Sequence, residues 1–290
     1  MTQKNFRESA KRSAILHRIY QQIYYLLLKR HFYGWTSPLR VLPDFIVIGV
    51  VRGGTTSLYD NLSKHPCIYS AAYDELGFFD SNFELGVNWY KSLFPSVLRK
   101  KISQLKRRCF MTYDVTPFYI YNEAAAKRIA SLLPKVKIVA LLRNPVDRAY
   151  SNYYLGVRDG VEKMSFEDAV AVEMEELKEK ESLSLDRYDQ TRSYIVKGFY
   201  AEQLKIWFEL FPKEQMLLLA SEDFAREPIK IMNQIFEFLK LPPFEVRNFE
   251  KTNLGNYIPM KDDTRRLLTD YFRPHNEKLY RMMGRDFDWD

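Results

Sequence analysis

The sequence contains few cysteines, few histidines and no long apolar run. Two cysteines in 290 residues could pair, but they form no disulfide framework, so we expect buried unpaired thiols and a reducing compartment. None of the four histidines has the spacing of metal ligands, which argues against a zinc site. No stretch of about 18 apolar residues occurs, so we expect no membrane-spanning helix. These absences predict a globular, cytoplasmic protein.

The composition is that of a basic globular chain. Hydrophobic residues make up 46% of it, which is ample for a sizeable core in one large domain. The formal net charge is +7 and the isoelectric point is about 9.1, which suits an anionic cofactor, an anionic acceptor, a membrane surface or nucleic acid. Since no motif for reading bases or grooves is present, nucleic acid is not an expected partner.

The first 40 residues differ from the rest of the chain. Apolar residues at Ile15, Ile19, Ile23 and Leu26 recur at helical spacing, and lysine and arginine flank them. This pattern predicts an amphipathic helical arm over residues 1–40, followed by a single domain over residues 41–290. The arm either packs on the domain or lies on a lipid surface, so peripheral membrane contact through it is an open possibility.

Strand-like and helical patterns alternate after the arm. This alternation predicts an α/β, P-loop-like three-layer fold with a central, mainly parallel sheet flanked by helices. The expected strands are 45–50, 110–113, 137–142 and 215–219. The expected helices are 56–63, 123–132, 146–157, 165–180, 192–211 and 228–239.

Two charged segments need an interpretation of their own. The segment 173–181 is rich in glutamate and lysine and is expected to be a solvated helix face. The basic segment 98–108, LRKKISQLKRR, is either a solvated loop or a docking patch for an acidic acceptor.

A glycine-rich loop follows the first expected strand, in FIVIGVVRGGTTSLY at 45–59. It lacks the lysine of a phosphate-binding P-loop, because Thr55 stands in that place and the nearby cation is Arg52. A glycine turn that opens a helix aims backbone N–H groups and the helix dipole at one point, so phosphate or sulfate is the natural occupant. The alternative to an anion-binding loop is a tight turn with Thr55 as an ordinary helix cap.

The strand at 137–142 ends in Arg143, within LLRNPVDRAYSNY, where a triphosphatase would carry a metal-binding aspartate. Arginine repels a divalent cation and attracts another phosphate. The two loops together therefore predict two separate anionic groups and no metal. A nucleotide with a 5′ phospho-anhydride and a separate 3′ phosphate meets that requirement, and a sulfuryl group carries too little negative charge to demand a metal ion.

In these motifs the sequence resembles the sulfotransferases that use 3′-phosphoadenosine-5′-phosphosulfate (PAPS), in particular the heparan sulfate N- and 3-O-sulfotransferase domains and their bacterial relatives. The resemblance runs from Pro43 to Trp289. GVVRGGTTSLYDNLSKHP is similar to the family's 5′-phosphosulfate loop and LLRNPVDRAYSNY to its 3′-phosphate motif. Between them lie ELGFFD, WYKSLFP and DVTPFYI in the family's order, and YFRPHNEKLYRMMGRDFDW near the end is similar to the family's closing helix.

The resemblance implies roles for individual residues. Arg52 would stabilise the leaving group, or only bind the donor, and Glu75 would be the general base, unless it is a surface residue without catalytic duty. The residues expected to hold PAPS are Arg52, Gly53, Gly54, Thr55, Thr56, Ser57, Arg143, Ser151 and Lys251. Of these, Lys251 and the nearby Gly255 rest on a loose match that a plain surface turn would also explain. Arg148 is expected to form an ion pair or to pack between helices.

Several positions depart from the family pattern. Arg52 stands where the family usually has lysine, which keeps the positive charge but cannot give up a proton. Asp74 and Val115 stand where lysines are common, and Gly77 where histidine or glutamine is common. These changes remove positive charge from the acceptor side, so a densely anionic acceptor is disfavoured.

The resemblance implies metal-independent transfer of a sulfuryl group from PAPS to a hydroxyl or amine, with PAP as product. The expected acceptor is a glycan or glycolipid, with a small alcohol left open. One alternative is a P-loop kinase or other triphosphatase, which a chelator would inactivate. Another is a non-catalytic, membrane-associated PAPS-binding module, which would be indifferent to Glu75→Gln.

Overall fold

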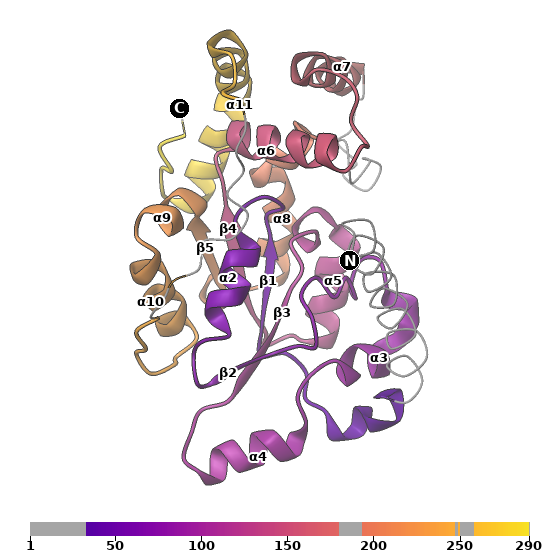
Figure 1. Ribbon diagram of the computed structural model, residues 1–290, viewed down its shortest axis with the longest axis vertical. Coiled ribbons are helices and arrows are strands. Elements are labelled where there is room, and N and C mark those ends of the chain that lie inside the picture. Colours follow the sequence, from indigo (N-terminus) through magenta and orange to yellow (C-terminus); the bar gives the residue numbers. More distant parts are fainter. Residues whose placement is uncertain (1–32, 180–192, 247–248, 250–257, 290) are drawn as a thin grey trace, which may run out of the picture.

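A five-stranded parallel sheet forms the centre of the protein (Figure 1). The computed structural model describes residues 33–179, 193–246, 249 and 258–289. The strands are β1 (Phe45–Gly49), β2 (Ile68–Ser70), β3 (Met111–Val115), β4 (Lys137–Leu142) and β5 (Met216–Ala220), and their order across the sheet is β2-β3-β1-β4-β5. The predicted α/β fold with a parallel sheet is thereby confirmed.

The inner strands are buried on both faces, which explains their continuous apolar sequences. All five residues of β1 are buried, as are five of the six residues of β4. Helices cover both faces of a parallel sheet, so such strands need no polar alternation. The strand that the pattern analysis missed, β2, has three residues, of which only Ile68 is buried, and therefore has no periodicity to read.

Helices pack on both faces of the sheet and complete three layers. On one face, Phe45 and Val47 of β1 belong to a core that includes α2 and α10. On the other face, Ile46 and Ile48 belong to a core that includes α5, α8 and the end of α11. The helices are α2 (Thr55–Leu62), α3 (Gly86–Ser92), α4 (Val97–Leu105), α5 (Glu123–Leu132), α6 (Pro145–Arg158), α7 (Phe166–Glu179), α8 (Tyr200–Leu210), α9 (Ser221–Arg226), α10 (Pro228–Phe238) and α11 (Asp262–Met283). Short 3₁₀ turns lie at η2 (Tyr33–Leu39), η3 (Phe83–Leu85), η4 (Tyr119–Tyr121), η6 (Val196–Gly198) and η7 (Lys213–Gln215).

Three local predictions are wrong. The expected helix over 192–211 is interrupted, because η6 precedes α8, which begins only at Tyr200. The segment 98–108 is not a loop, because most of it forms α4. The prediction of a solvated helix face over 173–181 is wrong for Glu173, although Glu175, Glu176 and Lys178 are exposed as expected. Glu173 is buried, and its carboxylate accepts backbone N–H bonds from Tyr194, Ile195 and Val196.

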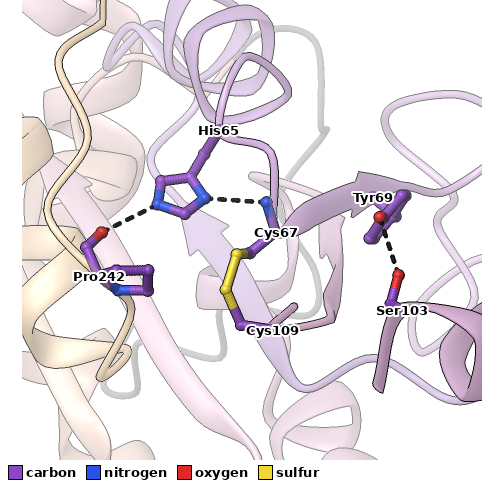
Figure 2. Close-up of a disulfide and its surroundings, with 6 residues drawn as sticks. All are labelled: His65, Cys67, Tyr69, Ser103, Cys109 and Pro242. Atoms are coloured by element: carbon purple, nitrogen blue, oxygen red, sulfur yellow. Dashed lines mark hydrogen bonds between the residues drawn. A yellow bond between two sulfur atoms is a disulfide. The ribbon is translucent and has the colours of Figure 1, made fainter. Parts of the chain in front are cut away.

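The expectation of unpaired cysteines is also wrong. Cys67, just before β2, and Cys109, just before β3, form a disulfide whose Cα atoms are 5.0 Å apart (Figure 2). Parallel pairing of β2 with β3 brings these two strand starts together. His65 supports the same corner, since its Nδ1 accepts the Cys67 N–H at 3.1 Å and its Nε2 lies 3.1 Å from the Pro242 carbonyl. The cysteines therefore give no support to a reducing compartment.

The predicted arm falls mostly outside the described residues, which begin at 33 within η2. The division into an arm over 1–40 and a domain over 41–290 stays a prediction. Among the residues that the structure describes, no helix has both the length and the apolar character needed to cross a bilayer.

Candidate active site

The candidate residues converge at the carboxyl ends of three neighbouring strands. Arg52 follows β1, Arg143 follows β4, and the backbone N–H of Glu75 donates to the carbonyl of Val115, the last residue of β3, at 2.8 Å. Since β3, β1 and β4 are adjacent in the sheet, the three loops share one edge. In open α/β sheets this edge is where ligands bind.

Backbone crowding fixes the glycine loop between β1 and α2. A Cβ atom on Gly53 would lie 2.6 Å from the Leu141 carbonyl oxygen and 2.9 Å from that of Val50. Gly54 has a φ of +94°, a conformation that side chains disfavour. The Ser221 hydroxyl at the start of α9 holds the loop from outside by donating to the Gly53 carbonyl at 2.8 Å.

The first turn of α2 directly follows this loop and has backbone N–H donors available. The four leading N–H groups of a helix have no partner inside the helix, and in the described structure no side chain caps α2 at Gly54. Thr55 and Ser57 are buried and Thr56 is half-buried. The arrangement is that of an anion-binding helix start with hydroxyl groups around it.

Arg52 directly links the two loops that the sequence predicts to bind anions. Its Nε donates to the Ser151 hydroxyl on α6 at 2.9 Å, and its carbonyl accepts a bond from Nη1 of Arg143 at 2.9 Å. Ser151 is almost fully buried, whereas both arginines are half-buried. Two guanidinium groups and a hydroxyl thus stand beside the helix start, which makes this corner strongly attractive to anionic groups.

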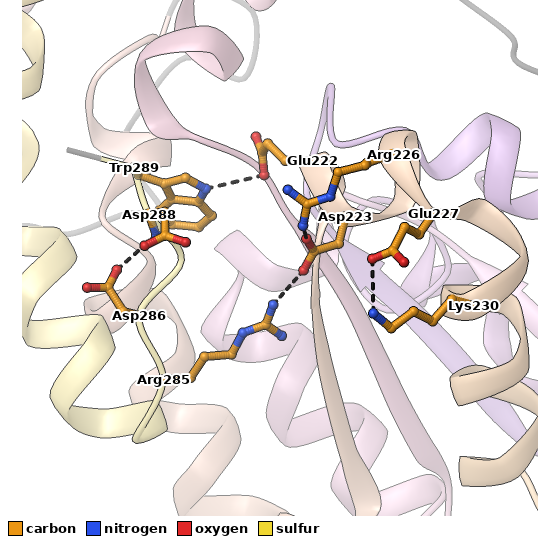
Figure 3. Close-up of polar contacts among 9 residues, drawn as sticks. All are labelled: Glu222, Asp223, Arg226, Glu227, Lys230, Arg285, Asp286, Asp288 and Trp289. Carbon is orange, nitrogen blue, oxygen red and sulfur yellow. Dashed lines mark hydrogen bonds and ion pairs between the residues drawn. The ribbon is translucent and has the colours of Figure 1, made fainter.

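The C-terminal tail secures the turn after β4. The Asn144 backbone N–H donates to Glu222 at 2.8 Å, and its side-chain amide donates to the Trp289 carbonyl at 3.3 Å. The Trp289 indole in turn donates to the second oxygen of Glu222 at 3.2 Å (Figure 3). Nearby, Arg285 pairs with Asp223 at 2.6 Å, which clamps the tail to α9.

Glu75 lies in an exposed turn with a left-handed backbone, at a φ of 51°. Partial desolvation by the surrounding protein raises the pKa of its carboxyl group, and repulsion from Asp74 and Asp80 raises it further. A carboxylate with a raised pKa is a better proton acceptor at neutral pH than an ordinary one.

A buried carboxylate, Asp114 on β3, braces the loop that carries Glu75. It accepts bonds from the hydroxyls of Tyr90 and Tyr119, both at 3.0 Å, and of Thr116 at 2.8 Å. The same Tyr119 oxygen accepts the Phe78 N–H at 2.8 Å. Asp114 therefore positions the segment after Glu75 through its partners, and burial raises its pKa to about 6.

Lys197 is a buried cation that the sequence analysis did not identify. It lies in η6, with its Nζ 5.6 Å from the ring centre of Phe118 and 6.0 Å from that of Tyr121. Arg148 is also buried and donates to the Tyr194 carbonyl, with Glu173 close enough to interact electrostatically. The false prediction of one helix over 192–211 hid the irregular turn that buries Lys197.

The family model described as "Sulfotransferase domain" matches residues 42–264, most of the chain. The chain belongs to the sulfotransferase-domain family. A "Membrane-associated sulfotransferase kil1" from Dictyostelium discoideum is 26% identical and covers 87% of this chain and 67% of its own length. A heparan sulfate glucosamine 3-O-sulfotransferase 3B1 from Mus musculus is 29% identical, with coverages of 86% and 65%.

A human bifunctional heparan sulfate N-deacetylase/N-sulfotransferase 3 is likewise 29% identical over 88% of this chain but only 32% of its own length. The chain thus spans about two thirds of the first two relatives and about a third of this one. Among solved structures, a sulfotransferase from Alicyclobacillus acidocaldarius has a TM-score of 0.66 and 29% identity, covering 86% of this chain and 99% of its own. The Alicyclobacillus sulfotransferase and the present chain therefore share the same fold.

The described residues do not test two of the predictions made for the present chain. Lys251 and Gly255 lie outside the described residues, so their contact with a 3′ phosphate stays a prediction. Within the described ranges, no group of three or more histidine, cysteine, aspartate or glutamate side chains could hold a metal ion. Metal independence of the reaction also stays a prediction.

Proposed function

We propose that this sulfotransferase moves a sulfuryl group from PAPS to a hydroxyl or amine of an acceptor and releases PAP. The observation that carries the proposal is the contact of Arg52 with both Ser151 and Arg143, which joins the helix-start loop to the second basic loop. A donor with anionic groups at both the 5′ and the 3′ end of one adenosine needs two such loops side by side.

The residues present fit this donor. At Gly53 the loop packs so closely on the carbonyl oxygens of Leu141 and Val50 that a Cβ atom has no room, so glycine is needed to hold the loop in this shape. Gly54, Thr55, Thr56 and Ser57 would hold the 5′ end through backbone N–H groups and hydroxyls. Arg143 and Ser151 would hold the 3′ phosphate, and Lys251 would add a further cation to it.

PAPS supplies a sulfuryl group joined to a phosphate through a bridging oxygen. Glu75 takes the proton of the acceptor hydroxyl or amine while the acceptor atom bonds to sulfur. The bond from sulfur to the bridging oxygen breaks, and its electron pair stays on the phosphate of PAP. Arg52 stabilises the negative charge on that phosphate, for which a permanent cation suffices and no proton is needed.

We further propose a glycan or glycolipid acceptor that is less anionic than heparan sulfate. Two of the relatives are named for heparan sulfate, which supports a glycan. The turn around Glu75, however, carries Asp74 and Asp80, and Val115 adds no charge at the end of β3. Acidic groups at the mouth of a site repel a densely sulfated chain.

The name of the Dictyostelium relative supports a peripheral membrane contact, which we assign to the amphipathic arm over residues 1–40. We also keep the domain over 41–290 as the catalytic unit. The cytoplasmic location stays a prediction that the Cys67–Cys109 disulfide does not support, because disulfides persist mainly in oxidising compartments.

The test incubates the full chain with labelled PAPS and extracted glycans or glycolipids, and calorimetry measures PAP binding separately. We expect transfer that persists in chelator, together with a fall in kcat of about 100-fold or more in Glu75→Gln while PAP binding is unchanged. Glu84→Gln is the matched control, because it removes an exposed carboxylate from η3. Loss of transfer in chelator would refute the proposed metal-independent mechanism. PAP binding without any transfer, indifferent to Glu75→Gln, would indicate a non-catalytic binding module.

A further inference from the structure

Helix α4 is attached to the domain by its polar side. Ser103 is buried, and its hydroxyl lies 3.1 Å from that of Tyr69. The Arg99 guanidinium stacks on the Tyr69 ring at 4.5 Å, and the Lys100 ammonium lies 5.8 Å from the Phe110 ring. The side chains through which α4 contacts the domain are thus serine, arginine and lysine, whereas an ordinary surface helix makes this contact with apolar residues.

The opposite side of α4 is apolar and faces solvent. Leu98, Ile102 and Leu105 are spaced four and three residues apart, so they form one stripe along the helix. Their exposed fractions are 65%, 44% and 83%. Single exposed leucines are common on protein surfaces. A continuous apolar stripe on the solvent-facing side of a helix, with polar residues on the side facing the domain, indicates a surface that contacts another apolar phase.

Positive charge surrounds this stripe. Residues 97–108 contain six basic residues and no acidic residue. The exposed ones beyond the inner face are Lys101, Lys106, Arg107 and Arg108, and none of these four forms an ion pair within the described residues. Since helical residues turn by about 100° each, Lys101 lies next to Leu98 and Leu105 on the outer face.

A second exposed apolar pair adjoins the helix. Trp35 and Leu39 of η2 are 89% and 67% exposed. The backbone next to Leu39 pairs with Ser96, the residue that caps α4. Tryptophan is enriched at the boundary between lipid headgroups and acyl chains.

We propose that α4 and η2 form a docking surface for a lipid bilayer that contains anionic headgroups. A bilayer offers an acyl region for the stripe and a negative surface for the surrounding cations, and it offers both at once over a flat area. This surface includes the last residues of the predicted arm over 1–40, because η2 spans Tyr33–Leu39, and it is separate from the active site.

The position of α4 fixes how the enzyme faces the bilayer. The helix precedes β3 and lies at the amino ends of the strands, whereas the candidate site lies at their carboxyl ends (Figure 1). Docking through α4 therefore leaves the donor loop open to the aqueous side. A glycan that extends away from the surface can reach it, whereas a bare lipid headgroup under the protein cannot.

The experiment is vesicle co-sedimentation of the full chain, with phosphatidylcholine vesicles and with vesicles that also contain phosphatidylserine. The test variant carries Leu98→Gln, Ile102→Gln and Leu105→Gln. The matched control carries Val172→Gln, Ile229→Gln and Leu267→Gln, which are exposed apolar residues on α7, α10 and α11. A thermal melt of each variant checks that these exposed substitutions leave the fold intact.

We expect the unmodified chain and the matched control to bind the phosphatidylserine vesicles, and the α4 variant to bind at least about tenfold more weakly. Binding should also weaken in high salt, because the cations on α4 contribute to it. Equal binding by the α4 variant would overturn the proposal and leave the arm as the contact. Conversion of a dimer to a monomer by the α4 substitutions, measured without vesicles, would also overturn it, since a second copy of the chain would then cover the stripe.

Discussion

Replacing Asp114 by asparagine tests the electrostatic cost of the buried carboxylate that braces the Glu75 loop. Asp114 is fully enclosed, and desolvation raises its pKa from 3.8 to about 6 although Thr116, Tyr90 and Tyr119 donate hydrogen bonds to it. Asparagine has nearly the same shape, and its carbonyl oxygen can accept both tyrosine hydroxyls. The substitution therefore removes the charge while it keeps most of the packing.

The sign of the effect follows from the raised pKa. The folded protein binds the Asp114 proton more tightly than the unfolded chain does, so the free energy of unfolding falls as the pH rises from about 4 to about 6. A pKa difference of about two units corresponds to about 3 kcal/mol. Relative to the unmodified protein, Asp114→Asn should gain about that much stability between about pH 4 and about pH 7.

The assay is urea-induced unfolding of both proteins at a series of pH values, with the difference in unfolding free energy plotted against pH. All other carboxylates are common to both proteins and cancel in this difference. Asp262→Asn, at an exposed position on α11, makes the same chemical change without burial and serves as control. A difference that stays constant across the pH range would refute the reasoning.

Three further predictions concern the donor loop and the disulfide. Gly53→Ala should weaken PAP binding, measured by calorimetry, by about 100-fold, because the new Cβ atom would press on backbone oxygens. In the control Gly34→Ala the Cβ atom would meet nothing within 4 Å, so the affinity for PAP should be unchanged. Ser151→Ala removes the hydroxyl that accepts a hydrogen bond from Arg52 at 2.9 Å, and it should weaken PAP binding about tenfold while kcat at saturating PAPS is preserved. An unchanged dissociation constant for PAP would show that this hydroxyl does not contact the donor. Replacing both Cys67 and Cys109 by serine removes a cross-link across a separation of 42 residues and should lower the free energy of unfolding in urea by about 2–4 kcal/mol. Equal stability of the oxidised protein and the double variant would show that the disulfide does not form in solution.

The residue order was sufficient to predict four of the five strands and the glycine loop, because these features depend on local signals. Buried parallel strands such as β1 and β4 are runs of apolar residues, and a glycine turn before a helix is visible in the residue order. Family resemblance then located Arg52, Glu75 and Arg143 on the loops that the structure brings to one edge of the sheet.

Which of these residues contact one another became clear only from the three-dimensional fold. Arg52 and Ser151 are 99 positions apart, and only the pairing of β1 with β4 brings their loops together. The same holds for Cys67 and Cys109, which the pairing of β2 with β3 joins. Contacts between distant segments depend on the order of strands across the sheet, and local periodicity carries no information about that order. For the same reason the apolar stripe of α4 could be recognised as exposed only after the opposite, polar face of the helix was found against the domain.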